Sequence, residues 1–215
     1  MKNNFIRPSA IIFDFDDTLI DARPAVHKAL KATLKKFDIS DNIITEKNID
    51  TNKSLRDYFH HIFANNIIEA RDSYYDYYTE FSKDLKQLEM AEDVLKFLRK
   101  QDVFTAIVSN KGGKRLRDEI HNHFGWQHYF DVIVGSGDAE EDKPSPIPAR
   151  HALKSANIDD LSNVWLIGDS LIDIQTAKNL GCKAVLFGSN KIAEEIHLNV
   201  LNHRELLNIF KRIYV

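Results

Sequence analysis

Polar side chains that could transfer a phosphoryl group follow several apolar segments of this chain. Asp14 and Asp16 lie in the sequence FDFDDT, Ser109 in VSN, Lys143 in DKPSP and Asp169 in GDSLID. A carboxylate can attack phosphorus and form an aspartyl-phosphate, which divides one difficult step into two. A lysine and a hydroxyl can stabilise the charge that develops on the phosphoryl oxygens. These residue types therefore predict a phosphoryl-transfer site, provided that the fold brings them together.

The acids in this set also suit a divalent metal ion and proton transfer. Mg²⁺ prefers hard oxygen ligands and is usually held by one or two carboxylates together with substrate phosphate. Asp14 and Asp169 could hold the ion from adjacent strands, and the ion would offset their mutual repulsion. Asp16 could protonate the leaving oxygen and later deprotonate the attacking water, which requires one acid to be protonated while its neighbour is ionised. We therefore expect Mg²⁺ as the cofactor.

Buried parallel strands are predicted to position these groups. The apolar segments are nearly continuous in Ile, Val, Leu and Phe, and amphipathic helical patterns lie between them. The predicted strands are 10–15, 104–110, 131–136, 163–169 and 183–189. The predicted helices are 91–100, 113–124, 146–156, 171–180 and a closing helix over 203–215. This alternation predicts an α/β fold, a doubly wound parallel sheet whose carboxyl edge gathers the polar residues.

One connection is far longer than a crossover helix requires, because it joins the first predicted strand to the second over residues 16–103. It contains helical stretches at about 23–37, 54–64 and 66–85 and no strand-like segment. We therefore expect two domains. The catalytic core comprises 1–20 and 88–215, and an inserted α-helical cap domain comprises 21–87 beside the carboxyl edge of the sheet.

The motifs resemble those of a known superfamily. DFDDT, VSN, KPSP and GDSLID look like the four motifs of the haloacid dehalogenase (HAD) superfamily, in the expected order. The resemblance covers essentially the whole chain, because the helical insert after the first motif also matches the superfamily's cap. Further local matches, GSGDAEEDKPSP and IGDSLIDIQTAKNLGC, are most similar to the phosphoglycolate phosphatase-like branch. The resemblance implies a HAD-like Rossmannoid core with an inserted helical cap.

The same resemblance implies roles for the core residues. Asp14 would be the nucleophile and Asp16 the general acid and base. Ser109 would bind the transferring phosphoryl group, and Lys143 would neutralise the nucleophile and the phosphate.

Metal ligands are implied as well. Asp14 and Asp169 would ligate Mg²⁺, Asp173 would support the metal shell, and the main-chain carbonyl of Asp16 would be a further ligand. This chain departs from many relatives at Asp17, where they carry glycine. Because Asp tolerates positive φ better than most residues, Asp17 is expected to shape a turn.

Five further residues are candidates for binding substrate. Thr18 and Asn110 lie at the ends of the first two predicted core strands and could contact phosphate. Lys111, in SNKGGKR, either reaches the crevice or is a solvated lysine. Lys53 and Arg56 occupy the part of the insert where relatives carry a substrate-contacting loop, and the alternative is that they are surface charges.

These observations favour a Mg²⁺-dependent phosphatase that acts on a small phosphorylated metabolite. A phosphomutase of the β-phosphoglucomutase type shares every core residue and stays open. Carbon–halogen hydrolysis is disfavoured, because family dehalogenases lack an acid at the position of Asp16. From another class, a phospho-aspartate signalling module would use the same residue types, but receiver domains are much shorter and have no cap.

The composition limits which partners the protein is expected to bind and where in the cell it is expected to act. The net charge of −3 gives no overall attraction to nucleic acid or anionic membranes. The chain has no apolar segment near the roughly 20 residues that span a bilayer, and no signal peptide is recognised, so a cytoplasmic enzyme is expected. The single cysteine, Cys182, excludes an internal disulfide and is expected to be a small buried side chain. Both a monomer and a homodimer remain possible.

Overall fold

The computed structural model describes residues 7–44, 59–60, 62–63, 66–156, 158 and 160–214. The chain divides into two compact units. One comprises Met1–Ile20 and Gln87–Val215, and the other comprises Asp21–Lys86. The function of the second unit as a cap remains a prediction.

A parallel sheet of six strands forms the centre of the first unit, in the order β5-β4-β1-β6-β7-β8. The strands are β1 (Ala10–Phe13), β4 (Phe104–Gly112), β5 (Val132–Ser136), β6 (Val164–Gly168), β7 (Lys183–Phe187) and β8 (Leu198–Val200). The predicted α/β class and all five predicted core strands are confirmed. The short edge strand β8 was not predicted, because three residues are too few to establish a period.

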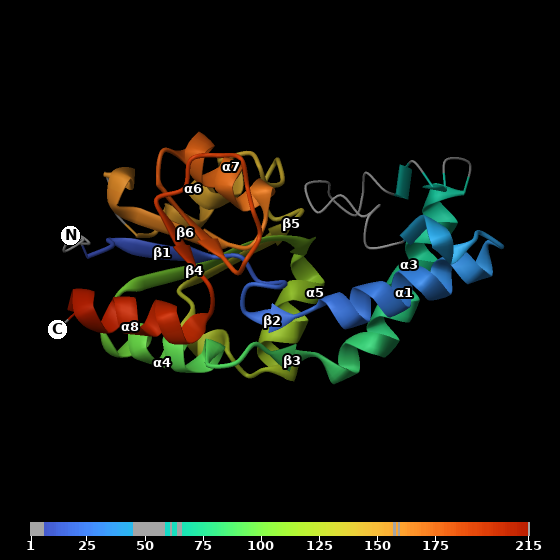
Figure 1. Cartoon of the computed structure of the whole chain (residues 1–215), viewed down its shortest axis with the longest axis horizontal. Coiled ribbons are helices and arrows are strands. Elements are labelled where there is room, and N and C mark those ends of the chain that lie inside the picture. Colours follow the sequence, from blue (N-terminus) through green and yellow to red (C-terminus); the bar gives the residue numbers. More distant parts are fainter. Residues whose placement is uncertain are drawn as a thin grey trace. The chain divides into compact units, whose positions relative to one another are not determined.

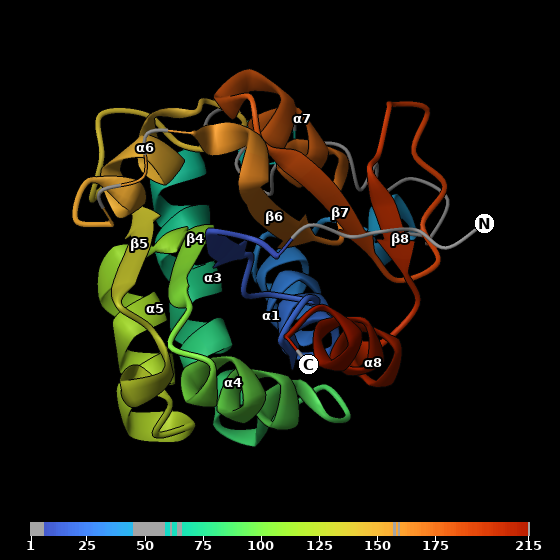
Figure 2. The same cartoon turned by 90° about the vertical axis from the view of Figure 1, so that its left-hand side faces the viewer.

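Helices cover both faces of this sheet. The helices are α4 (Ala91–Lys100), α5 (Gly113–Asp118), α6 (Ile147–Leu153), α7 (Leu171–Leu180) and α8 (His203–Tyr214). Figures 1 and 2 show α6 and α7 on one face and α4, α5 and α8 on the other. The predicted helix 113–124 is divided, because α5 passes into a π-helical turn at Glu119–His123.

Apolar side chains fill the spaces between the sheet and the two helical layers. On the face covered by α6 and α7, Ile12 and Leu166 belong to a buried cluster with Ala177 and Cys182. On the other face, the rings of Trp165 and Phe210 lie 5.9 Å apart. The prediction that Cys182 is buried is confirmed, and burial raises the pKa of its thiol to about 12.

The path of the chain explains where a ligand crevice opens. From β1 the chain continues to β4 and β5 on one side, and it then crosses to β6, β7 and β8 on the other. The order of the strands therefore reverses between β1 and β6. Phe13, the last residue of β1, pairs with Ile107 of β4 and Ile167 of β6, so the residues that follow these strands meet at one edge. In open α/β sheets, ligands bind at this switch point.

The second unit is built around an antiparallel helical pair, α1 (Arg23–Lys36) and α3 (Ile67–Phe81), with short 3₁₀ turns at Asp41–Ile44 and Ser82–Asp84. Tyr74 and Tyr78 are buried, whereas Tyr75 is 43% exposed. Most of the predicted helix 54–64 lies outside the described residues.

Two very short strands, β2 (Ile20–Asp21) and β3 (Lys86–Gln87), pair where the chain passes between the units, and they were not predicted. Within the described ranges, no helix combines the length and hydropathy needed to cross a bilayer.

Candidate active site

Asp14 lies directly beyond β1 and is held by the sheet itself. Its main-chain N–H donates to the carbonyl of Ile167 at 2.9 Å, which continues the pairing of β1 with β6 by one residue. The chain then turns sharply, with Asp17 at a φ of 59° and its N–H donating to the carbonyl of Ile20 at 2.8 Å. The prediction that Asp17 shapes a turn is confirmed. The turn keeps Asp14 and Asp16 at the mouth of the strand.

A buried lysine links Asp14 to a second carboxylate. The Lys143 ammonium contacts Asp14 Oδ1 and Asp173 Oδ1, each at 2.6 Å. The side chains of Lys143 and Asp173 are 3% and 1% exposed. We call Asp14, Lys143 and Asp173 the Lys143 triad. It joins residues from the end of β1, the loop after β5 and helix α7.

Charge and burial oppose each other in the Lys143 triad. Burial alone would lower the pKa of Lys143, but the nearby carboxylates of Asp14 and Asp173 outweigh it and raise that pKa. Burial also raises the pKa of Asp14 well above its usual range, and Lys143 offsets this only in part, because Asp173 and Asp169 add negative charge. The lysine therefore stays charged, and the Asp14 carboxylate would be stabilised by a further cation.

Asn110 fixes the main chain of Lys143 with both ends of its side-chain amide. Its Nδ2 donates to the Lys143 carbonyl at 2.9 Å, and its Oδ1 accepts from the Lys143 N–H at 2.9 Å. The sequence predicted a phosphate contact for Asn110, which stays a prediction. The structure gives the amide a contact that the sequence did not suggest, namely that it holds Lys143 in place.

A glycine and a helix cap place Asp173. A Cβ atom at Gly168 would lie 2.3 Å from Asp173 Cγ, so only glycine lets this carboxylate approach the end of β6. Asp173 Oδ2 accepts from the Ser170 N–H at 3.1 Å and from its hydroxyl, and Ser170 Oγ accepts from the Asp173 N–H. This reciprocal capping box begins α7 and fixes the carboxylate by its second oxygen.

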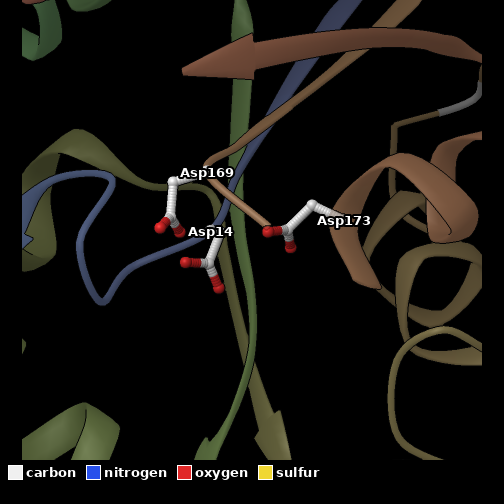
Figure 3. Close-up of side chains that lie close together, drawn as sticks. All are labelled: Asp14, Asp169 and Asp173. Atoms are coloured by element: carbon white, nitrogen blue, oxygen red, sulfur yellow. The ribbon is translucent and has the colours of Figure 1, made fainter. Parts of the chain in front are cut away.

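The two carboxylates of the Lys143 triad and that of Asp169 converge and could hold a metal ion. Asp14, Asp169 and Asp173 each offer an oxygen, and these atoms lie within 4.8 Å of one another (Figure 3). Ligands at about 2.1 Å around an octahedral Mg²⁺ lie roughly 3–4 Å apart, so the cluster fits this ion. Because Lys143 and Ser170 already engage both oxygens of Asp173, Asp14 and Asp169 fit best as direct ligands. Asn190 donates to the Asp169 carbonyl at 2.8 Å.

A second lysine contacts the other acid of the first motif. The Lys111 ammonium lies 2.6 Å from Asp16 Oδ1, contacts Glu119 Oε2, and lies 5.1 Å from the centre of the Phe15 ring. The side chains of Lys111 and Glu119 are buried, whereas that of Asp16 is 32% exposed. We call Asp16, Lys111 and Glu119 the Lys111 triad. Burial raises the pKa of Glu119, Lys111 lowers it in part, and Asp16 raises it further.

An irregularity at the end of β4 presents Ser109 and Lys111. The register between β4 and β5 shifts between Val108 and Gly112, and such bulges redirect side chains beside active sites. Ser109 is buried, and its hydroxyl accepts from the Lys111 N–H at 3.2 Å. The structure therefore places Ser109 next to Lys111. Its predicted contact with a phosphoryl group remains a prediction.

A close approach of two chain segments supports this irregular stretch. A Cβ atom at Gly135 of β5 would lie 2.5 Å from Gly113 Cα and 2.7 Å from the Lys111 carbonyl. Gly135 therefore lets the two strand ends pass each other at backbone contact.

Thr18, Lys53 and Arg56 are the remaining residues that were predicted to contact substrate. Thr18 is fully buried, and its hydroxyl has no hydrogen-bond partner within the described ranges. Its proposed contact with substrate is not tested by this geometry. Lys53 and Arg56 lie outside the described residues.

Glu119 was missed by sequence reasoning, although the sequence carries a signal for it. Leu116 and Ile120 form the fully buried apolar stripe of the helical segment, and Glu119 lies on the same stripe. A carboxylate at an apolar position of an amphipathic helix requires a buried partner, because an unpaired buried charge is very costly. The partner itself, Lys111, is evident only in the fold.

Known proteins resemble this chain over most of its length. The family model described as haloacid dehalogenase-like hydrolase matches residues 11–187. A phosphoglycolate phosphatase of Neisseria meningitidis is 29% identical over 189 residues, which cover 82% of this chain and 78% of that protein. The pyrophosphatase PpaX of Listeria welshimeri is 28% identical over 177 residues, covering 80% and 79%. The crystal structure of a HAD-superfamily hydrolase from Ehrlichia chaffeensis is 31% identical, covers 97% of this chain and 98% of that one, and has a TM-score of 0.68.

Proposed function

Since this chain belongs to the haloacid dehalogenase-like hydrolases, we propose that it is a Mg²⁺-dependent phosphatase of small phosphorylated metabolites. The observation that carries this proposal is the Lys143 triad beside Asp169, at the switch point of the sheet. A buried carboxylate next to a permanently charged lysine and a further acid suits attack on a phosphoryl group and not simple structural pairing.

In the first step, a carboxylate oxygen of Asp14 attacks phosphorus, and the bond from phosphorus to the leaving oxygen breaks. Asp16 gives its proton to that oxygen, so the product alcohol leaves neutral. Lys143 and the Ser109 hydroxyl stabilise the charge on the phosphoryl oxygens. The enzyme then carries an aspartyl-phosphate on Asp14.

In the second step, Asp16 takes a proton from a water molecule, and the water oxygen attacks phosphorus. The bond between phosphorus and Asp14 breaks, inorganic phosphate is released, and Asp14 returns as a carboxylate. Asp16 regains the proton that it gave up, so both acids end in their starting states.

Asp14 and Asp169 would hold Mg²⁺ with their carboxylates, the Asp16 carbonyl would add a main-chain oxygen, and Asp173 would keep the site in order through Lys143. When bound, Mg²⁺ would neutralise part of the phosphate charge and polarise the phosphoryl group. The raised pKa of Asp14 fits this proposal, because that carboxylate lacks sufficient positive charge from the protein alone.

The similar proteins suggest which class of substrate to test first. Phosphoglycolate phosphatases and a pyrophosphatase are among the similar proteins, so a phosphomonoester of a small acid and pyrophosphate are the first compounds to test. A phosphomutase would use the same core residues, and a signalling module would keep its phospho-aspartate. The products distinguish these three activities.

The test measures phosphate release over a panel of phosphoglycolate, sugar phosphates, nucleotides and pyrophosphate, with and without Mg²⁺. We expect stoichiometric free phosphate that depends on Mg²⁺, and a loss of about 10⁴-fold or more in kcat for Asp14→Asn. An isomerised substrate without free phosphate would instead identify a mutase. Phosphate release that persists in Asp14→Asn would contradict the proposal.

A further inference from the structure

The Lys111 triad contains two buried residues to which the proposed reaction gives no role. Lys111 was expected either to reach substrate or to be solvated, yet its side chain is 6% exposed and its ammonium contacts Asp16 and Glu119. Glu119 is buried on the apolar stripe of its helical segment. A buried ion pair contributes little net stability compared with apolar packing of the same volume, so stability alone does not account for this pair.

The contacts form a chain that begins at buried residues and ends at Asp16, the acid at the mouth of β1. Glu119 begins the π-helical turn Glu119–His123, and such turns are frequent at functional sites. Glu119 contacts the Lys111 ammonium, which also lies over the face of the fully buried Phe15 ring. Phe15 is fixed in turn by an edge-to-face contact with Phe124, with ring centres 6.2 Å apart. The ammonium thus has a fixed place.

At the solvent-facing end of the triad lies the Asp16 carboxylate. In the proposed reaction it must lose and regain a proton while its position stays fixed. Lys111 lies 2.6 Å from Asp16 Oδ1, and the Asp16 side chain is 32% exposed. A partly exposed carboxylate would otherwise sample several rotamers, whereas a general acid must lie within hydrogen-bond reach of the leaving oxygen.

We propose that Lys111 and Glu119 are positioning residues for the acid/base chemistry of Asp16, with Glu119 fixing Lys111 and Lys111 fixing the carboxylate. This inference rests on the proposed phosphatase function. Lys111 does not bind the phosphoryl group in this scheme; it acts through Asp16. The bulge at the end of β4 and the close approach of Gly135 bring Lys111 to that acid.

The leaving group provides the test. An alkyl phosphate needs a proton on its leaving oxygen, whereas p-nitrophenyl phosphate expels a stabilised phenolate without one. Because kcat/KM reports the first phosphoryl transfer, Lys111→Met should lower kcat/KM by about 10- to 100-fold for the best alkyl phosphate of the panel and much less for p-nitrophenyl phosphate. Glu119→Gln, which keeps the shape of the side chain, should also lower kcat/KM selectively for the alkyl phosphate, but by a smaller factor.

Matched variants separate a positioning role from a direct contact with substrate. Lys178→Met removes an exposed lysine, paired with Glu194 at 3.1 Å, and should leave both substrates unaffected. Lys111→Arg should recover part of the loss. In an Asp16→Asn background, Lys111→Met should cause no additional loss, because its effect acts through that acid.

Each contrary outcome overturns the inference. An equal loss on both substrates would assign Lys111 to the phosphoryl group or to general site structure. A raised KM with unchanged kcat would make it a substrate contact. A Glu119→Gln protein that melts earlier but keeps the wild-type ratio between substrates would make Glu119 purely structural. If the wild-type enzyme releases no phosphate from any substrate with Mg²⁺, the proposed function fails, which is distinguishable from all of these.

Discussion

The two triads at the mouth of β1 have the same arrangement of charges and different surroundings. Each places a lysine between two carboxylates, with Lys143 between Asp14 and Asp173 and Lys111 between Asp16 and Glu119. In the Lys143 triad, all three side chains are largely removed from solvent. In the Lys111 triad, the interior end is equally buried, but Asp16 is substantially exposed.

This difference matches the chemistry proposed for each acid. A nucleophile must be shielded from water and held against a cation, because its charge is consumed and restored at phosphorus. An acid and base must exchange protons with a leaving group and a water molecule, so it needs an open side. Under the proposed function, the same arrangement of charges would serve two tasks, and the burial of the acid at one end would distinguish them.

The largest expected effect concerns stability and compares the two lysines. Lys143→Met leaves two buried carboxylates without their cation and should lower the free energy of unfolding by about 3–5 kcal/mol without Mg²⁺. Lys111→Met should cost less, because water can solvate Asp16 after the change. Urea denaturation of both variants in EDTA measures this difference. Equal losses would mean that the exposure of Asp16 does not distinguish the triads.

Stabilisation by Mg²⁺ should depend on the side-chain carboxylate of Asp14 in the Lys143 triad and not on that of Asp16. At 100 times its Kd, the ion should stabilise the protein by about 2.7 kcal/mol, which raises Tm by roughly 5–10 °C for a chain of this size. Asp14→Asn should shrink the gain, whereas Asp16→Asn keeps the main-chain carbonyl and should retain most of it. Thermal melts with and without Mg²⁺ provide the measurement. A wild-type protein that shows no response to Mg²⁺ would count against the whole scheme.

Substitution of two glycines tests whether each triad depends on a close approach that only glycine allows. Gly168→Ala would press its Cβ against Asp173, and Gly135→Ala would press against the main chain of Gly113. Each should cost about 1–3 kcal/mol of stability. Gly112→Ala is the matched control, because a Cβ there meets nothing within 4 Å and its φ is −52°. If Gly112→Ala is as damaging as the other two, the close approaches are not the cause.

The smallest effect is a change in the pH dependence of stability. The pKa of Glu119 is raised by burial in the folded protein, so above its unfolded value near 4.5 the folded state binds more protons than the unfolded state. The stability that Glu119 contributes is therefore present at low pH and declines as pH rises above 4.5. Relative to wild type, Glu119→Gln should become more stable with increasing pH, as measured by urea midpoints. The exposed Glu140→Gln serves as the control, and a flat difference for Glu119→Gln would contradict the assigned direction.

Much of the fold could be predicted from local patterns. Helices Ala91–Lys100 and Leu171–Leu180 begin and end where the periodicity and the glycine at 181 place them, and Gly181 adopts a φ of 82°. The parallel strands could be recognised because strands covered on both faces are nearly continuous in apolar residues. The paired strands Ile20–Asp21 and Lys86–Gln87 could not be recognised in the sequence, because two residues are too few to show a periodic pattern.

The sequence by itself determined which chemical groups are present, their order, and their common position at the carboxyl edge of a parallel sheet. These properties depend on residue type and on neighbours along the chain. The motif resemblance implied that Lys143 neutralises Asp14. Only the tertiary structure showed that Lys143 also contacts Asp173, and that Lys111 joins Asp16 to Glu119. Asp14 and Lys143 are 129 positions apart, and Asp16 and Lys111 are 95 apart. These pairings depend on a bulge, on the close approaches at Gly135 and Gly168, and on the burial of Glu119. All three arise from tertiary packing, so no local periodicity predicts them.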